Sequence, residues 1–161
     1  MRILVTGGNG QLGSEFSKFQ KNNEKDEWFL MSISELDITN SLAVEHFIKT
    51  HEITHLINTA AYTNVEQAEE EEEVAFRVNA KAVKNMAKLA KKYELTFIHI
   101  STDYVFDGSS SNPYSEDAVT NPINVYGASK LKGEAAILEI APKNAAILRT
   151  SWLYGANGNN F

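Results

Sequence analysis

A tyrosine and a lysine four residues apart, Tyr126 and Lys130, are the side chains of this sequence that best fit acid–base chemistry. On a helix, positions i and i+4 share one face, so the phenol and the ammonium can converge on one point. Free tyrosine keeps its proton up to about pH 10, and a nearby cation lowers this pKa because it favours the phenolate. The pair can therefore exchange a proton in the interconversion of a carbonyl and an alcohol. The alternative is two unrelated side chains on a solvated helix face.

A hydroxyl-bearing segment, Ser101-Thr102-Asp103-Tyr104, follows an apolar run at 97–100 that predicts a strand. In open parallel sheets, ligands bind outside the carboxyl ends of the strands. The Thr102 hydroxyl can hydrogen-bond a substrate carbonyl oxygen there and support Tyr126 as negative charge develops on that oxygen. An ordinary polar loop is the alternative interpretation.

Glycines at three-residue intervals, Gly7, Gly10 and Gly13, follow the first apolar run and open the first helical segment. Glycine permits a tight turn and lets the backbone approach a diphosphate closely, and the helix N-terminus adds aimed N–H groups. This strand–turn–helix context predicts a dinucleotide site. An acidic residue at the end of the second strand would hold the adenosine ribose, but 30–34 contains none, and it contains no arginine for a 2′-phosphate. Asp37 then faces the adenine, and the choice between NADH and NADPH stays open.

His51-Glu52-Ile53-Thr54-His55 matches the H-E-x-x-H pattern of zinc sites. That motif needs both histidines on one face of a continuous helix. The β-branched Ile53 and Thr54 lead into a strand, so the helix should end near Thr50, and we predict no metal site. His99 lies within a predicted strand and is expected to be a hydrogen-bonded core residue.

Strand and helix patterns alternate along the chain. Apolar runs predict strands at 3–5, 28–30, 55–57, 97–100 and 145–148, and helical spacing predicts helices at about 12–19, 40–48, 64–93 and 125–140. We expect Asn40 or Thr39 to cap the second helix, and Thr63 with Glu66 to form a capping box at the third. The acidic stretch 69–73 is expected to be a solvated helix turn. This alternation predicts an α/β fold with a doubly wound parallel sheet.

Composition narrows the class of protein. The 161 residues, 43% hydrophobic and 22% charged, suit one globular domain. A net charge of −6 argues against nucleic-acid binding, and no apolar run reaches the roughly 20 residues of a membrane span. There is no cysteine and no leader pattern, so we expect a cytoplasmic protein that binds neither nucleic acid nor membrane.

With these motifs, the chain resembles the extended short-chain dehydrogenase/reductase superfamily and, within it, the dTDP-4-dehydrorhamnose reductase family. The resemblance covers essentially the whole chain. The segments that carry it, besides the glycine loop, are Asn58–Thr63 with Val65 and Ala68–Glu69, Ser101–Gly108, Pro122–Gly127, Ser129–Leu131 with Gly133–Glu134, Arg149–Tyr154 and Gly158–Phe161. It implies that residues 1–161 form an NAD(P)-binding domain of the Rossmann type, and that the chain is an N-terminal fragment of a longer reductase that ends before the substrate-binding part.

The resemblance also implies the reaction and its residues. The reaction is reduction of the C4 ketone of a dTDP-linked 4-keto-6-deoxyhexose by NADPH or NADH, giving dTDP-L-rhamnose. Tyr126 would donate the proton, Lys130 would hold the nicotinamide ribose and lower the tyrosine pKa, and Thr102 would bond the carbonyl oxygen. The implied cofactor residues are Gly7, Gly10, Gln11, Leu12, Gly13, Asp37, Ile38, Ala60, Ala61, Tyr62, Tyr126 and Lys130. The implied substrate residues are Val65, Thr102, Asp103 and Trp152.

Two other functions stay open alongside the reductase, and a homodimer is one possible assembly. Sugar-nucleotide dehydratases and epimerases share the glycine loop and the Tyr/Lys pair, but dehydratases carry a glutamate where this chain has Tyr104. The regulatory subunit of methionine adenosyltransferase resembles these reductases and acts by binding alone. The intact set of Thr102, Tyr126 and Lys130 favours an enzyme.

Overall fold

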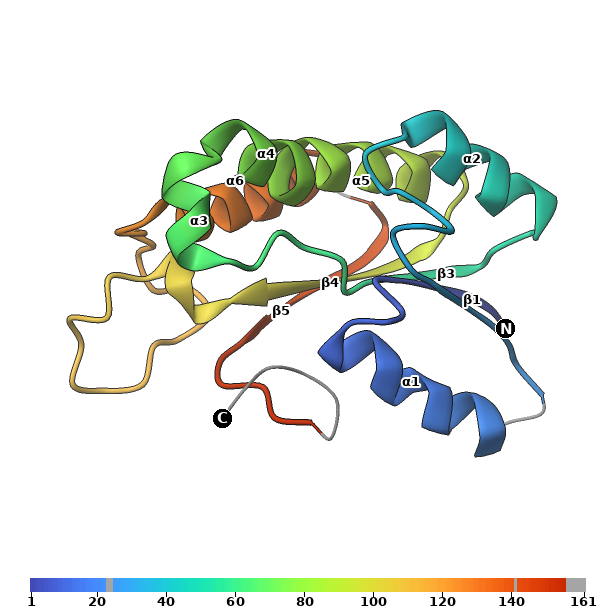
Figure 1. Cartoon of the computed structure of the whole chain (residues 1–161), viewed down its shortest axis with the longest axis horizontal. Helices are drawn as coiled ribbons and strands as arrows, with labels where there is room; N and C mark the ends of the chain where they lie inside the picture. The colour runs from blue at the N-terminus through green and yellow to red at the C-terminus, as the bar shows by residue number, and fades with distance from the viewer. Residues whose placement is uncertain (23–24, 141, 156–161) are drawn as a thin grey trace.

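The computed structural model describes residues 1–22, 25–140 and 142–155 and is built on one five-stranded parallel sheet (Figure 1). Its strands lie in the order β2-β1-β3-β4-β5. Their bounds are Arg2–Thr6 for β1, Glu27–Met31 for β2, His55–Asn58 for β3, Thr96–Thr102 for β4 and Asn144–Thr150 for β5. All five predicted strands are confirmed. The central strands β1 and β3 are buried on both faces, as expected in a parallel sheet, whereas the edge strand β5 is largely exposed.

Helices cover both faces of the sheet, as a doubly wound fold requires. Helix α1 (Gln11–Asn22) lies on one face, and α2 (Ser41–Thr50), α5 (Val83–Lys92) and α6 (Val125–Ile140) lie on the other (Figure 1). Alternate residues of each strand therefore enter two different cores. Ile3, Val5 and Ile57 pack toward α1, whereas Leu4 and Leu56 belong to the larger core beneath α2 and α5.

The long helix expected over 64–93 is in fact four consecutive segments. They are α3 (Val65–Glu70), α4 (Glu72–Phe76), a π-helical turn η1 (Arg77–Ala82) and α5. Glu71 separates the first two with a non-helical backbone (φ −114°, ψ 41°). The predicted capping box is also wrong, because the side chain of Asn64, not that of Thr63, accepts the N–H of Gln67 at 3.1 Å. An amide and a hydroxyl are both good caps, so local preference alone could not choose between these neighbours.

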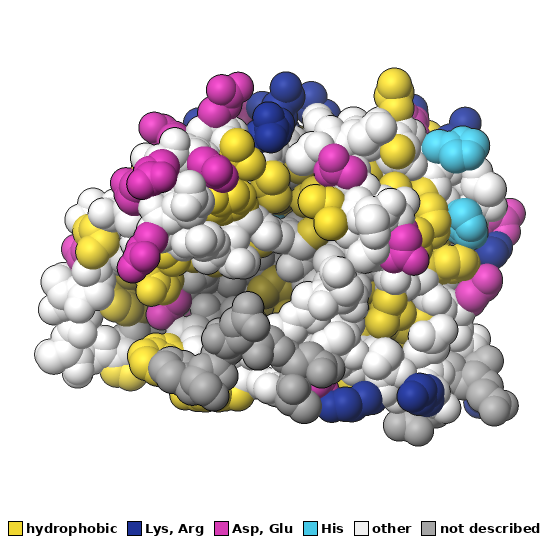
Figure 2. Space-filling model, viewed as in Figure 1, with side chains coloured by type: hydrophobic (Ala, Val, Ile, Leu, Met, Phe, Trp, Pro, Cys, Tyr) yellow, Lys and Arg dark blue, Asp and Glu magenta, His cyan; other side chains and the backbone are white. Residues whose placement is uncertain are grey.

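The acidic stretch 69–73 is exposed, as expected for a solvated turn, and its carboxylates gather on the surface over α3 and α4 (Figure 2). Two of these carboxylates nevertheless hydrogen-bond residues outside α3 and α4. Glu69 accepts the backbone N–H of Val125 at 2.8 Å, and Glu71 accepts the Tyr62 hydroxyl at 2.8 Å. The first contact ties α3 to the start of α6.

Within the described residues, no helix is both long and apolar enough to cross a membrane.

Candidate active site

A cleft of about 770 Å³ opens at the carboxyl ends of the strands, and Figure 2 shows the molecule hollowed near the centre of the face in view. Parallel strands end at the same edge, so the loops after β1, β2, β3, β4 and β5 all reach this cleft. Most residues assigned to the site from the sequence line it: Gly7, Gly10, Gln11, Leu12, Asp37, Ile38, Ala60, Ala61, Tyr62, Val65, Thr102, Asp103, Tyr126, Lys130 and Trp152.

The glycine loop is packed so tightly that three of its glycines, Gly7, Gly8 and Gly13, have no room for a side chain. Gly7 has φ of +74°, and a Cβ there would lie 2.7 Å from the backbone nitrogen of Ala60. A Cβ on Gly13 would lie 2.1 Å from the Gly7 carbonyl oxygen. Gly13 therefore packs α1 against the loop and is not among the residues that line the cleft in the described part of the chain.

Gly10 and the first turn of α1 form the part of this loop that faces the cleft. Gly10, Gln11 and Leu12 line the cleft, where the positive end of the helix dipole can receive a diphosphate. These residues fit the diphosphate of a dinucleotide, because Gly10 lines the cleft without a side chain and lets a ligand approach the loop backbone closely. Gln11 also donates to the carbonyl oxygen of Leu153 at 2.7 Å, which holds the segment after β5 beside the loop.

The loop after β2 places the residues predicted to face adenine. Ile38 is buried with an exposed fraction of 5%, and the exposed Asp37 accepts the N–H and the hydroxyl of Thr39, each at 2.8 Å. Glu35, which lies outside the 30–34 window, folds back to accept the backbone N–H of Ser32 at 2.8 Å. The hydrogen bonds from Ser32 lower the pKa of Glu35. They also hold its carboxylate at the end of β2, where residues 30–34 alone offer none.

Tyr126 and Thr102 meet at the buried end of the cleft. Both are nearly inaccessible, with exposed fractions of 9% and 5%. Burial raises the pKa of Tyr126, a hydrogen bond with Thr102 lowers it, and the charge of Asp103 raises it again. The expected lowering by the lysine is therefore not what this geometry gives. The phenol is protonated at neutral pH, which is the state that a proton donor needs.

The start of α6 is fixed in three ways, and this fixes Tyr126. Asn124 accepts the N–H of Gly127 at 2.7 Å, and Glu69 accepts the first N–H of the helix. A Cβ on Gly127 would lie 2.2 Å from the carbonyl oxygen of Tyr104, so only glycine lets α6 approach the 3-10 turn η2 (Asp103–Val105) this closely. The rings of Tyr104 and Tyr126 then meet edge to face with centroids 5.6 Å apart.

Lys130 lies one turn further along α6 and is almost completely buried, with an exposed fraction of 2%. Its Nζ donates to the carbonyl oxygen of Ile100 at 2.7 Å and lies 3.5 Å from Nε2 of His99. Burial lowers the pKa of Lys130 to about 8, against the charge of Glu134, which raises it. An amine that titrates near neutral pH can take up or release a proton under working conditions.

Three buried residues that the sequence did not assign to the site hold its walls together. Asn79, in η1, accepts the N–H of Tyr62 at 2.9 Å and donates to the carbonyl oxygen of Tyr62 at 2.9 Å and to Ser129 at 3.0 Å. Glu134 accepts the Ser101 hydroxyl at 2.5 Å and Nη2 of Arg149 at 2.7 Å. His99 is fully buried and hydrogen-bonded, as expected. Each of these contacts spans 15 or more residues, so no local pattern could reveal it.

The other three predicted substrate residues, Val65, Asp103 and Trp152, also line the cleft. Val65 begins α3, Asp103 accepts the Thr102 hydroxyl at 3.0 Å, and Trp152 is 68% exposed with φ of +50°. Arg77 also lines this cleft, and no sequence pattern pointed to it. The Gly158–Phe161 segment of the family resemblance lies outside the described residues.

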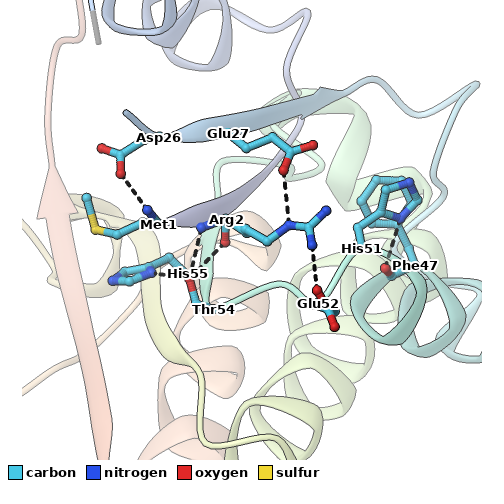
Figure 3. Close-up of polar contacts among 9 residues, drawn as sticks. All are labelled: Met1, Arg2, Asp26, Glu27, Phe47, His51, Glu52, Thr54 and His55. Atoms are coloured by element: carbon cyan, nitrogen blue, oxygen red, sulfur yellow. Dashed lines mark hydrogen bonds and ion pairs between the residues drawn. The ribbon is translucent and has the colours of Figure 1, made fainter. Parts of the chain in front are cut away.

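The H-E-x-x-H segment lies at the opposite, amino edge of the sheet (Figure 3). Helix α2 ends at Thr50, as predicted, and Asn40 caps its start. His51 stacks on Phe47 with ring centroids 4.0 Å apart, whereas His55 contacts the Thr54 hydroxyl at 2.8 Å. The two histidines do not share a helix face. The described residues contain no group of three or more histidine or carboxylate side chains placed to hold a metal ion.

Comparison with known proteins gives consistent results. A dTDP-4-dehydrorhamnose reductase of Aggregatibacter actinomycetemcomitans is 44% identical over 99% of this chain and 54% of its own length. The structure of such a reductase from Clostridium acetobutylicum is 42% identical, with a TM-score of 0.94 over 100% of this chain and 56% of that one. One from Bacillus anthracis, in complex with NADP, is 39% identical with a TM-score of 0.93 over 99% of this chain and 56% of that one.

The chain thus spans about half the length of the curated relatives that it matches. A family described as the RmlD substrate binding domain matches over residues 1–161, which is the entire sequence. The Rossmann-type sheet, the glycine loop and the Tyr/Lys pair on α6 all lie within this match. The chain therefore belongs to the RmlD substrate-binding domain family.

Proposed function

We propose that this chain provides the cofactor site and the proton-transfer groups of an NAD(P)H-dependent reductase. The reaction is reduction of the C4 ketone of dTDP-4-dehydro-L-rhamnose to dTDP-L-rhamnose, a step in nucleotide-sugar synthesis for cell-surface polysaccharide. The observation that carries this proposal is that the buried Thr102 and Tyr126 line the same cleft as the glycine loop. The names of the relatives support the substrate class.

Each residue of the pair has a role that follows from its state. The bound nicotinamide, in its reduced form, supplies the hydride. Tyr126 is protonated because burial raises its pKa, so it can give its proton to the C4 oxygen. Thr102 hydrogen-bonds the same oxygen while charge develops on it. Lys130 lies on the same face of α6 as Tyr126 and would hold the nicotinamide ribose and supply the replacement proton.

The cofactor would run along the cleft from the loop after β2 to Lys130. Gly10, Gln11 and Leu12 would hold the diphosphate, and Asp37 with Ile38 would face the adenine. The loop after β3 would contact the middle of the cofactor through Ala60, Ala61 and Tyr62. Val65, Thr102, Asp103 and Trp152 would face the sugar.

A second substrate of the same class deserves a parallel assay. A relative from Streptomyces niveus, 40% identical over 99% of this chain, is named a dTDP-4-keto-6-deoxy-D-glucose reductase. Both sugars are dTDP-linked 4-keto-6-deoxyhexoses, and the pair of Thr102 and Tyr126 would act on the C4 oxygen of either. Dehydration is disfavoured, because Tyr104 stands where a dehydratase carries its glutamate.

The test measures oxidation of NADPH with each keto sugar by the full-length gene product. Tyr126→Phe is expected to bind NADPH like the wild type. Its turnover should fall at least about 100-fold, because a positioned general acid commonly accelerates a reaction by at least this factor. Tyr93→Phe is the matched control. Tyr93 follows the last residue of α5, away from the cleft, and its hydroxyl donates to Glu45 of α2. Reduction at the parent rate by Tyr126→Phe would disprove the assigned acid, and NADPH binding by the wild type without turnover would favour a binding module.

We further propose that residues 1–161 form one nucleotide-binding domain of a cytoplasmic protein that assembles as a homodimer. One continuous sheet supports the single domain, and the cysteine-free sequence fits a reducing compartment. Leu138 in the last turn of α6 is 70% exposed and is the apolar side chain that we place in the contact between copies. Light scattering on the purified protein tests the dimer, and a monomeric mass at micromolar concentration would exclude it.

A further inference from the structure

A row of three buried polar side chains crosses the sheet directly beneath the cleft. Thr6, Asn58 and His99 occupy neighbouring positions on β1, β3 and β4, with Thr6 paired to Asn58 and Asn58 paired to His99. Each has an exposed fraction of 0%. The positions two residues earlier on the same strands are apolar and belong to the main core. The row is therefore a polar line on an otherwise apolar sheet face, and burial makes its hydrogen bonds obligatory.

The donors and acceptors along this row run in one direction. The Thr6 hydroxyl donates to Oδ1 of Asn58 at 2.7 Å. Nδ2 of Asn58 lies 2.9 Å from Nδ1 of His99, and an amide nitrogen can only donate, so Nδ1 is the acceptor. Burial and the charge of Lys130 hold the pKa of His99 well below its usual value, so the ring is neutral. A neutral imidazole carries one proton, which must then be on Nε2.

This Nε2–H faces the amine of Lys130 across 3.5 Å. An ammonium has donors only, so an N–H aimed at it makes no hydrogen bond, whereas a neutral amine accepts that N–H through its lone pair. Lys130 keeps its own bond to the carbonyl oxygen of Ile100 in either state. Thr6 therefore influences the proton equilibrium of Lys130 without touching it, because the Thr6 hydroxyl orients the Asn58 amide and the amide sets the tautomer of His99.

Charged and titratable side chains on several elements also influence the proton equilibrium of Lys130. Glu134 lies one turn later in α6 and favours the ammonium, but Arg149 of β5 holds its carboxylate in an ion pair at 2.7 Å. Tyr126 lies one turn earlier and is protonated. The further charged side chains that line the cleft, within the described part of the chain, are Asp37, Arg77 and Asp103.

We propose that the Thr6–Asn58–His99 row fixes the proton of His99 on Nε2 and thereby favours the amine of Lys130 over its ammonium. His99 is then a positioning residue that acts through Lys130 and keeps this lysine ready to exchange a proton. The row starts at the residue before Gly7, so it joins the glycine loop to the proton-transfer pair. The catalytic consequence rests on the proposed function, whereas the tautomer of His99 does not.

Nitrogen NMR of the intact chain tests the tautomer directly. Two-bond ¹H–¹⁵N correlations distinguish a protonated from an unprotonated ring nitrogen, and His99→Gln identifies the signal among the 4 histidines. The wild type is expected to carry the proton on Nε2. Thr6→Val keeps the branched shape and removes the donor, so the Asn58 amide can turn and accept Nδ1–H, and His99 should change tautomer. Thr6→Ser keeps the hydroxyl and should keep the wild-type tautomer.

A titration of ¹³C-labelled lysine then tests the effect on Lys130. In Thr6→Val the Lys130 midpoint is expected to rise by about one pH unit, a tenfold change in the proton equilibrium, because Nε2 now accepts from the ammonium. Thr6→Ser should leave the midpoint unchanged. A wild-type proton on Nδ1 would overturn the proposal even if Thr6→Val fails to fold, and so would a changed tautomer with an unmoved lysine. Neither spectrum involves cofactor or sugar, so loss of the reductase assignment would leave the result standing.

Discussion

Alanine at Gly13 and alanine at Gly10 should separate the packing of the glycine loop from its contact with a nucleotide. A Cβ on Gly13 would lie 2.1 Å from the Gly7 carbonyl oxygen and 2.8 Å from Cα of Gly8, whereas ordinary contacts begin at 3.4 Å. Both neighbours are backbone, so α1 must move away from the loop by more than an ångström. The nearest heavy atom to a Cβ on Gly10 is the same oxygen at 3.2 Å, which needs a shift of only a few tenths of an ångström.

These distances set the expected sizes of the two effects. Overpacking costs about 1–3 kcal/mol, and the better helix propensity of alanine returns up to about 1 kcal/mol, so Gly13→Ala should lower the free energy of unfolding by about 1–2 kcal/mol. Gly10→Ala should stay within about 0.5 kcal/mol of the wild type. Its methyl group would stand where a diphosphate approaches, so we expect NADPH affinity to fall at least about tenfold, as one lost close contact of 1.4 kcal/mol would give.

Urea unfolding followed by circular dichroism measures the first quantity, and titration of NADPH fluorescence measures the second. The two variants are controls for each other, because they share a motif and a chemical change. A Gly13→Ala protein as stable as the wild type would show that α1 is not packed on the loop as described. A Gly10→Ala protein that binds NADPH normally would refute the assigned diphosphate site.

Three further changes probe the buried polar groups. Lys130→Met removes an amine whose pKa burial lowers to about 8. Urea unfolding at pH 7 should show a free energy of unfolding that is about 1–3 kcal/mol higher, and oxidation of NADPH should be lost. A lower free energy of unfolding would contradict this expectation. Glu134→Gln weakens a buried ion pair and should lower the free energy of unfolding by about 2–3 kcal/mol, whereas the exposed Glu139→Gln should leave it unchanged. His99 is held neutral in the folded chain, so the unfolded chain binds an extra proton below about pH 6.5. The free energy of unfolding should therefore fall as the pH drops through this value. His99→Gln should make the free energy of unfolding less dependent on pH between about pH 7 and 5.

The parts of the fold that follow from sequence are those with local causes. A run such as 97–100 predicts a buried strand by itself, and the spacing of Gly7, Gly10 and Gly13 predicts a turn before a helix. The cap at Asn40 and the end of α2 at Thr50 are equally local. The break at Glu71 is not, since five consecutive glutamates are good helix formers and give no stop signal.

The site was predictable only where it carried a motif. Tyr126, Lys130 and Thr102 stand out by spacing and by position at a strand end. Asn79 and Glu134 do not, because their partners Tyr62 and Arg149 are 17 and 15 residues away and are recognised only once the chain is folded. The pKa of Tyr126 was misjudged for the same reason. A sequence shows the neighbouring cation on the helix but not the burial that raises the pKa of Tyr126.

The buried polar residues of the described chain share a location that explains these results. Each of them lies at the cleft or bonds a residue that does, except Asn58, which joins Thr6 to His99; the nine are Thr6, Asn58, Asn79, His99, Ser101, Thr102, Ser129, Lys130 and Glu134. Burying a polar group costs stability unless it is hydrogen-bonded, so a fold without a site would have little reason to collect nine of them at one end of its sheet. Their hydrogen bonds hold Tyr126, Lys130 and Thr102 in place. Burying these polar groups therefore costs folding free energy but fixes the geometry of the side chains proposed for proton transfer.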